Sequence, residues 1–267
     1  MQFADIIGQK ETKQQLAELV QHNRLSHALL FLGKEGSGSL ALAIAFAQYV
    51  VCEKVNGGKS GVGSQESGPS LFGEPENSNV EPPTLNDSCG VCPACQKAQQ
   101  LIHPDIHFSY PTVTKKPGEK PVATDFITDW REFVKLSPYG NSYDWIEQIK
   151  EKENSQGKIT AEECNDIIRK LSLKSFESVY KILIMWMPEM LGTEGNKLLK
   201  LIEEPPPNTL FILVTENEAQ VLQTIVSRCQ LVKIPSLEAS EIEEALISRN
   251  KTEPATAKQV AALSDGN

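Results

Sequence analysis

The chain has 267 residues, of which 40% are hydrophobic and 23% are charged, and its formal net charge is −9 at pH 7. This length suits one large domain plus part of another, and the acidic balance argues against a protein whose sole task is to bind nucleic acid. No run approaches the roughly 20 apolar residues of a membrane span and the first residues do not resemble a signal peptide, so we expect a cytoplasmic protein with no membrane partner.

The beginning of the chain predicts a helix, a buried strand and a second helix. Residues 10–22 have helical periodicity, residues 28–32 are a short apolar run, and residues 39–51 are a long apolar segment. A glycine-rich turn, residues 33–40, connects the strand to the second helix. A strand, a glycine-rich turn and a helix in this order are the setting of a phosphate-binding P-loop.

This turn has the spacing of a P-loop but lacks its reactive side chains. The working motif is G-x-x-x-x-G-K-[ST]; Gly33 and Gly38 stand at its two glycine positions, with Gly36 between them. Ser39 replaces the lysine that holds the β- and γ-phosphates, and Leu40 replaces the hydroxyl that binds magnesium. We therefore expect no ATP hydrolysis here. Nucleotide binding without hydrolysis and a turn kept only for packing are both open.

Three of the six cysteines lie within seven residues and suggest a metal site. Cys89, Cys92 and Cys95 are evenly spaced, and Cys52 can supply a fourth thiolate. Four thiolates make a closed, structural zinc site, whereas free surface thiols and an iron–sulfur cluster are the alternatives. The segment between them, residues 53–88, is too polar and glycine-rich to bury much surface, and it predicts a flexible insertion.

The middle of the chain combines one more strand with a second insertion. Residues 105–110 can form a strand, whereas residues 111–158 are polar and irregular and predict an insertion with one or two short helices. Thr160 and Glu163 are spaced as a capping box that begins a helix. The apolar face of that helix consists of Cys164, Ile167, Ile168 and Leu171.

Apolar strands alternate with helices from residue 181 onward. The expected elements are a strand at 181–186, a helix at 193–203 that buries Leu198, Leu199 and Ile202, a strand at 209–215, a helix at 217–227 and a strand at 229–234. This alternation indicates a parallel sheet covered on both faces. After Pro235 the composition changes, and a second capping box at Ser240 and Glu243 predicts small helices.

Four segments carry a resemblance to a known family. They are residues 3–9 with 27–31, the four cysteines followed by His103-Pro104-Asp105, residues 196–206, and Ser227-Arg228-Cys229. Together they resemble the delta-prime family of clamp-loader subunits of bacterial DNA polymerase III, which are AAA+ proteins. The resemblance covers most of the chain outside residues 53–88 and 111–158.

The resemblance implies an α/β fold, a P-loop AAA+ domain with three αβα layers around a parallel five-stranded sheet. Residues 1–235 would form this domain, and residues 236–267 the start of a helical lid that precedes a collar beyond this sequence. A zinc module around residues 52–103 would hold Zn²⁺ on Cys52, Cys89, Cys92 and Cys95.

The resemblance also implies that the catalytic acidic motif is missing. By alignment to the family, Trp186 and Met187 occupy the positions of the Asp-Glu pair that binds magnesium and orients water. Thr215 occupies the position of the residue that senses the γ-phosphate, and we expect it to be structural here. We expect His103 and His107 to be ordinary residues.

In the family, the arginine of the Ser-Arg-Cys motif reaches into the ATP site of a neighbouring subunit. The resemblance therefore implies that Arg228, between Ser227 and Cys229, acts in trans on a motor subunit of the gamma or tau type. An ordinary surface ion pair is the alternative role for this side chain.

The implied protein is a non-hydrolysing subunit of the DNA polymerase III holoenzyme. Its further partners would be a delta-type wrench subunit, the sliding clamp and, through the complex, primer–template DNA. Because the collar drives oligomerisation in the family, we expect this 267-residue piece to be mainly monomeric.

Two other functions are open. One is an active gamma- or tau-type ATPase with an aberrant P-loop, which Ser39 and Trp186 argue against. The other is a zinc-dependent nucleic-acid-binding module, which would need a stripe of aromatic and basic residues that the sequence lacks. We expect the acidic helix face at Glu241, Glu243 and Glu244 to be solvated.

Overall fold

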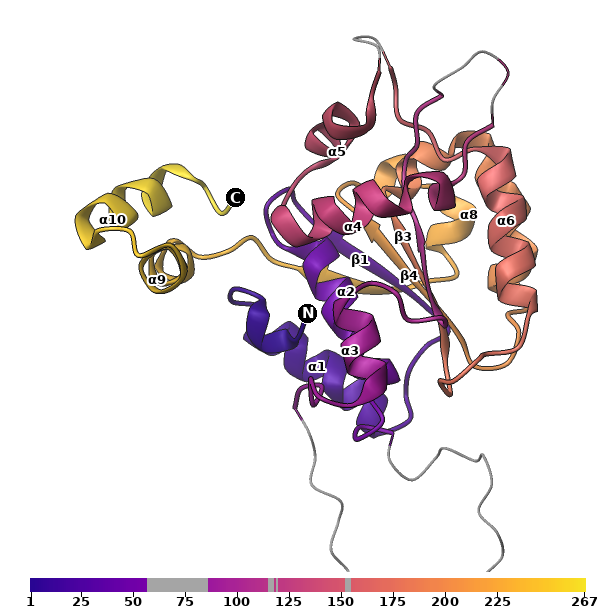
Figure 1. Cartoon of the computed structure of the whole chain (residues 1–267), viewed down its shortest axis with the longest axis horizontal. Helices are drawn as coiled ribbons and strands as arrows, with labels where there is room; N and C mark the ends of the chain where they lie inside the picture. The colour runs from indigo at the N-terminus through magenta and orange to yellow at the C-terminus, as the bar shows by residue number, and fades with distance from the viewer. Residues whose placement is uncertain (57–85, 115–117, 119, 152–154) are drawn as a thin grey trace, which may run out of the picture.

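The computed structural model describes residues 1–56, 86–114, 118, 120–151 and 155–267. Its sheet contains the strands β1 (Ala28–Gly33), β2 (Ile106–Ser109), β3 (Lys181–Trp186), β4 (Thr209–Thr215) and β5 (Gln230–Ile234). Their order is β2-β3-β4-β1-β5, and every neighbouring pair is parallel (Figure 1). The predicted five-stranded parallel sheet is confirmed. Residues 57–85, most of the expected flexible insertion, lie outside the described residues.

The helices alternate with the strands as the sequence predicts. The α-helices are α1 (Lys10–Gln21), α2 (Ser39–Val51), α3 (Pro93–Gln99), α4 (Ile127–Leu136), α5 (Ser142–Ile149), α6 (Ala161–Ser172), α7 (Leu199–Glu203), α8 (Gln223–Val226), α9 (Ala239–Asn250) and α10 (Pro254–Leu263). The 3₁₀ helices are η1 (Phe3–Asp5), η2 (Ala123–Phe126), η3 (Pro188–Leu198) and η4 (Glu218–Gln220).

Successive strand residues are buried in two cores, one on each face of the sheet. Phe31 of β1 and Ile184 of β3 belong to the core shared with α1 through α5. Leu30 and Leu183 belong to the core shared with α6, η3, α7 and α8. This arrangement is the three-layer αβα architecture (Figure 1). Every residue of α2 is buried, which explains why its sequence is apolar all round.

The second insertion forms two short helices, as predicted, but its aromatic residues belong to the core. Trp130 on α4 and Trp145 on α5 are completely buried, and their ring centroids lie 5.3 Å apart. Trp130 also stacks on Tyr110 at 4.1 Å and lies 5.4 Å from Trp186 at the end of β3. The insertion is therefore anchored over the carboxyl end of the sheet.

One of two predicted helices is broken. Residues 193–203 are helical as predicted, first as the end of the 3₁₀ segment η3 and then as the single turn α7, and the kink at Gly192, where φ is +54°, lies just before them. Leu198 and Ile202 are buried, and Leu199 is half-buried. The predicted helix at 217–227 is wrong, because extended backbone at Val221 and Leu222 separates η4 from α8.

The two predicted capping boxes differ from the observed ones. Thr160 caps α6 by accepting the Glu163 N–H at 3.2 Å, but the Glu163 carboxylate turns inward and accepts the N–H of Ala123 at 2.7 Å. The second box lies two residues earlier than predicted, because α9 already begins at Ala239. The Glu241 carboxylate accepts the N–H of Glu238 at 3.0 Å, so Ser240 lies inside the helix. Glu241 is thus a cap rather than a purely solvated residue.

Helices α9 and α10 lie to one side of the sheet domain (Figure 1). They share a small apolar cluster of Leu237, Ile242 and Ala261, on which Ile7 and Tyr139 of the sheet domain also pack. The boundary at residue 235 stays a prediction. Among the described helices, none combines the length and the apolar character that crossing a membrane requires.

Candidate functional site

The P-loop closes on itself through its own hydroxyls. Ser37 and Ser39 are buried, and their Oγ atoms lie 2.7 Å apart in a hydrogen bond. A Cβ atom on Gly33 would lie 2.2 Å from the Ser39 Oγ and 2.5 Å from the Ser37 Oγ, so a larger residue there would displace the bonded hydroxyls. The hydroxyl at the lysine position thus serves the turn and does not supply the cation that holds the β- and γ-phosphates in the working motif.

The space above the P-loop is filled by the second insertion. The cavity there has a volume of only about 30 Å³, and its walls include Leu40, Trp186 and Tyr139. Tyr139 lies so close that a Cβ atom on Gly38 would be 2.6 Å from its ring. A space of this size holds about one water molecule. Leu40 and Trp186 were two sequence signals that this site is packed rather than open, whereas nothing local pointed to Tyr139.

Trp186 and Met187 stand at the end of β3, where the resemblance implies the acidic pair, and both are buried. The nearest carboxylate after them, Glu189, is already engaged. Its Oε1 accepts the Thr215 hydroxyl at 2.9 Å and the N–H of Glu216 at 3.2 Å. Burial raises the pKa of Glu189. Thr215 therefore ties β4 to the segment after β3, which is a structural role.

Arg228 lies on the surface in the turn between α8 and β5. Its guanidinium donates to the Thr224 carbonyl at 2.6 Å and to the Ser227 hydroxyl at 3.3 Å, and it forms an ion pair with Glu203. About a third of the side chain is exposed, so the ion pair contributes at most about 1 kcal/mol. Cys229 is half-buried in the same turn. The Arg228 guanidinium is therefore charged, partly exposed and held in part by a weak ion pair.

The four predicted cysteines come together. The Sγ atoms of Cys52, Cys89, Cys92 and Cys95 all lie within 4.8 Å of one another, and those of Cys89 and Cys95 are 3.9 Å apart. Four sulfurs about 2.3 Å from a tetrahedral zinc ion would be about 3.8 Å apart. Cys52 and Cys95 are fully buried, which fits a site closed to water.

Backbone groups support sulfur in its charged form. The N–H of Cys89 donates to the Cys52 Sγ at 3.3 Å, that of Cys92 to the Cys89 Sγ at 3.4 Å, and that of Cys95 to the Cys92 Sγ at 3.5 Å. Contact with the Cys95 thiol lowers the pKa of Cys52 to about 4, and the same contact raises the pKa of Cys95. The four residues can therefore hold a metal ion that prefers thiolates.

The segment after the cysteines has a structural role that the sequence did not predict. Asp105 accepts the backbone N–H groups of Phe176, Glu177 and Ser178 at 2.5–2.8 Å, which fixes the loop before β3. His103 accepts the Asp105 N–H at 3.1 Å and faces the Glu177 carboxylate at 3.3 Å. Neither His103 nor His107 belongs to the four-cysteine group among the described residues.

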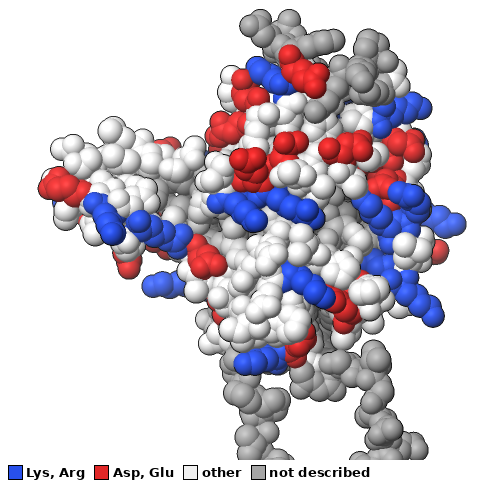
Figure 2. Space-filling view, in the orientation of Figure 1, with Lys and Arg blue, Asp and Glu red and all other residues white. Residues whose placement is uncertain are grey.

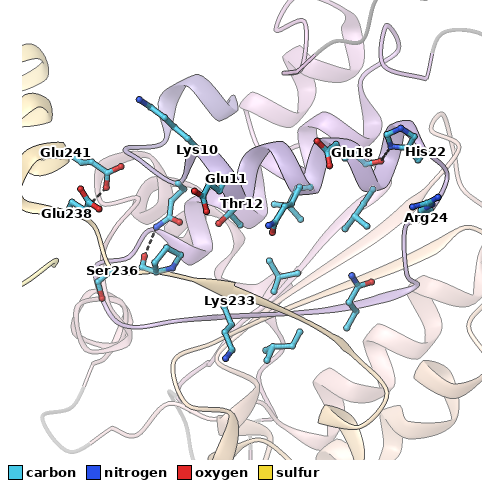
Figure 3. Close-up of a pocket in the computed structure, with 18 residues that line it drawn as sticks. Lys10, Glu11, Thr12, Glu18, His22, Arg24, Lys233, Ser236, Glu238 and Glu241 are labelled. Atoms are coloured by element: carbon cyan, nitrogen blue, oxygen red, sulfur yellow. Dashed lines mark hydrogen bonds between the residues drawn. The ribbon is translucent and has the colours of Figure 1, made fainter.

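A separate groove of about 870 Å³ runs between α1 and β5 (Figure 3). Figure 3 shows Glu238 and Glu241 at one end of this groove and His22 and Arg24 at the other. None of the four cysteines and neither Ser39 nor Arg228 lines it. Acidic and basic side chains are interspersed over the described part of the face in Figure 2.

The chain matches a family of known proteins over most of its length. Residues 8–69 and 70–238 match the family model described as DNA polymerase III, delta subunit. The chain belongs to this family. It is 26% identical over 231 residues to DNA polymerase III subunit delta' of Bacillus subtilis, which covers 86% of this chain and 49% of that protein.

Two further relatives have related names. The chain is 24% identical to DNA polymerase III subunit delta' of Escherichia coli, over 82% of this chain and 45% of that protein. It is 25% identical to DNA polymerase III subunit tau of B. subtilis, over 85% of this chain and 28% of that protein. The chain thus spans about half the length of these delta-prime relatives. The family to which the resemblance pointed is confirmed.

Proposed function

We propose that this chain is the AAA+ part of a clamp-loader delta-prime subunit that does not hydrolyse ATP. The filled P-loop carries this proposal: Tyr139 and Trp186 leave about 30 Å³ where phosphates would bind, and Ser39 and Leu40 replace the two reactive side chains. Met187 stands at the acidic position, and the Glu189 carboxylate that follows it accepts the Thr215 hydroxyl through its Oε1.

The role of the subunit is then to support its neighbours. Arg228 stands in a surface turn, is permanently charged and matches phosphate oxygens in shape, so it suits action in trans on a gamma- or tau-type motor subunit. The names of the delta-prime and tau relatives support this choice of partners. A delta-type subunit, the sliding clamp and primer–template DNA complete the proposed assembly.

Zn²⁺ is the metal that suits the four cysteines best. It accepts four thiolates in a closed tetrahedral site, and bound there it would join the end of α2 to the start of α3. Cys92 also caps α3 by accepting the N–H of Cys95, so metal binding and helix formation support one another. The proposed role of the metal is structural.

An active ATPase is the second candidate, because relatives named tau match the chain over a similar share of its length. Steady-state turnover of ATP by the purified chain separates the two functions. We expect a rate no higher than that of a matched Ser39→Ala variant, since Ser39 is bonded to Ser37 and not to a ligand. A wild-type rate clearly above the rate of Ser39→Ala would support the ATPase instead.

A further inference from the structure

The lid helices are attached to the sheet domain at the P-loop itself. The apolar cluster of Leu237, Ile242 and Ala261 at the base of α9 and α10 contacts Ile7 and Tyr139 of the sheet domain. Tyr139 is half-buried in the loop between α4 and α5. The lid therefore rests on a residue of the second insertion.

Tyr139 contacts three parts of the molecule at once. Its ring covers Gly38, the residue before α2, and packs on the lid cluster. Its hydroxyl accepts the backbone N–H of Ile7 at 2.8 Å. Pro138 and Gly140 line the same small cavity, so the loop on both sides of Tyr139 occupies the approach to the P-loop.

Gln9 makes a second connection between the same parts. It is buried, and its Nε2 donates to the carbonyl of Ser37 in the P-loop at 3.3 Å and to the carbonyl of Pro235, just before the lid, at 2.6 Å. Asn267, after α10, lies against Gly36 of the same loop. The P-loop thus contacts both the residue before the lid and the residue after α10.

We propose that the loop centred on Tyr139 is a built-in occupant of the nucleotide cleft, which fixes the lid against the P-loop without nucleotide. Any phosphate ligand that reached the start of α2 would have to displace the ring from Gly38 and break the contact with Ile7. A lid that is already fixed loses little further freedom when neighbours bind. A lid fixed in this way would make the proposed non-hydrolysing subunit rigid, and in this respect the proposal rests on the proposed function.

Hydrogen exchange of backbone amides in the whole chain tests the inference. In Tyr139→Ala, the amides of Ile7, Leu237 and Ile242 should exchange about tenfold faster or more. Local opening around these amides no longer requires the contacts of the Tyr139 ring to break, so it costs less free energy. Tyr139→Phe keeps the ring and loses the hydroxyl, so it should accelerate Ile7 alone. Tyr143→Ala is the matched control, since this tyrosine of the same insertion is 69% exposed, and it should change none of the three.

Two results would overturn the inference. One is wild-type exchange at Leu237 and Ile242 in Tyr139→Ala, or at Ile7 in Tyr139→Phe. The other is protection of the amides of residues 38–42 when millimolar ADP or ATP is added to the wild-type chain. If Tyr139→Ala unfolds globally, the Tyr139→Phe result decides alone. None of these readouts involves the clamp loader, so a failure of the proposed function in the assembled complex would leave them unchanged.

Discussion

Loss of one cysteine of the metal site should destabilise the whole chain. Cys95→Ser removes a fully buried thiol that lies 3.9 Å from the Cys89 Sγ, and three ligands no longer close the site. A metal held by the four cysteines would join Cys52 to Cys89 across residues 53–88 and restrict the unfolded chain, and its loss would release that restriction. The chain-entropy relation for a crosslink of this size gives about 4 kcal/mol.

The assay combines metal analysis with thermal unfolding. At about 2–4 °C per kcal/mol for a domain of this size, the midpoint should fall by roughly 8–16 °C, and bound zinc should drop from one equivalent to near zero. Cys164→Ser is the control, because Cys164 is equally buried on α6 but lies outside the cysteine group. If Cys95→Ser kept its zinc and had the same midpoint of thermal unfolding as Cys164→Ser, the metal-site assignment would be refuted.

Three further predictions concern buried side chains. Trp130→Ala should lower the free energy of unfolding by about 3–5 kcal/mol in denaturant titrations, whereas the exposed Tyr143→Ala should cost under about 0.5 kcal/mol, and equal losses would contradict the core assignment. Burial raises the pKa of Glu163 above 4.5, so the folded chain binds more protons than the unfolded chain, and its stability falls as pH rises from the unfolded pKa through the folded pKa. Glu163→Gln should reduce this fall, and an unchanged dependence of stability on pH would contradict the role of Glu163. Thr215→Val should cost about 1 kcal/mol of stability by removing one of the two donors to the Glu189 Oε1, yet should not change ATP turnover of the assembled complex. A drop in turnover would mean that Thr215 senses nucleotide.

The strands and the cysteine cluster could be predicted because most of their signals are local. Residues 181–186 and 209–215 are apolar runs that suit only strands buried on both faces, and both are fully buried. The three clustered cysteines had to lie close together, and the fourth, Cys52, was placed by the family resemblance. These features depend on residues that are neighbours in the sequence or on a recognised pattern.

The features that the sequence did not reveal depend on contacts between distant residues. Tyr139 covers Gly38 from more than 100 residues away, and Asp105 binds backbone amides of residues 176–178. The prediction of a capping box at Thr160 is half right: Thr160 caps the helix, but the Glu163 carboxylate accepts the N–H of Ala123, on another segment, and not that of Thr160. The predicted helix at 217–227 is wrong because helical residues alone do not show that Val221 and Leu222 adopt extended backbone.

The central claim is that a chain unable to hydrolyse ATP supplies Arg228 to a neighbour that can. The most direct test is DNA-dependent ATP turnover by the clamp loader reconstituted with the full-length subunit carrying Arg228→Ala. The control is Arg169→Ala, which removes another surface arginine from an ion pair, that with Asp166. We predict that only Arg228→Ala reduces turnover while assembly stays intact, with a loss of roughly 10³–10⁵-fold at the site it serves. Equal turnover with the two variants would make Arg228 an ordinary surface residue and contradict the account.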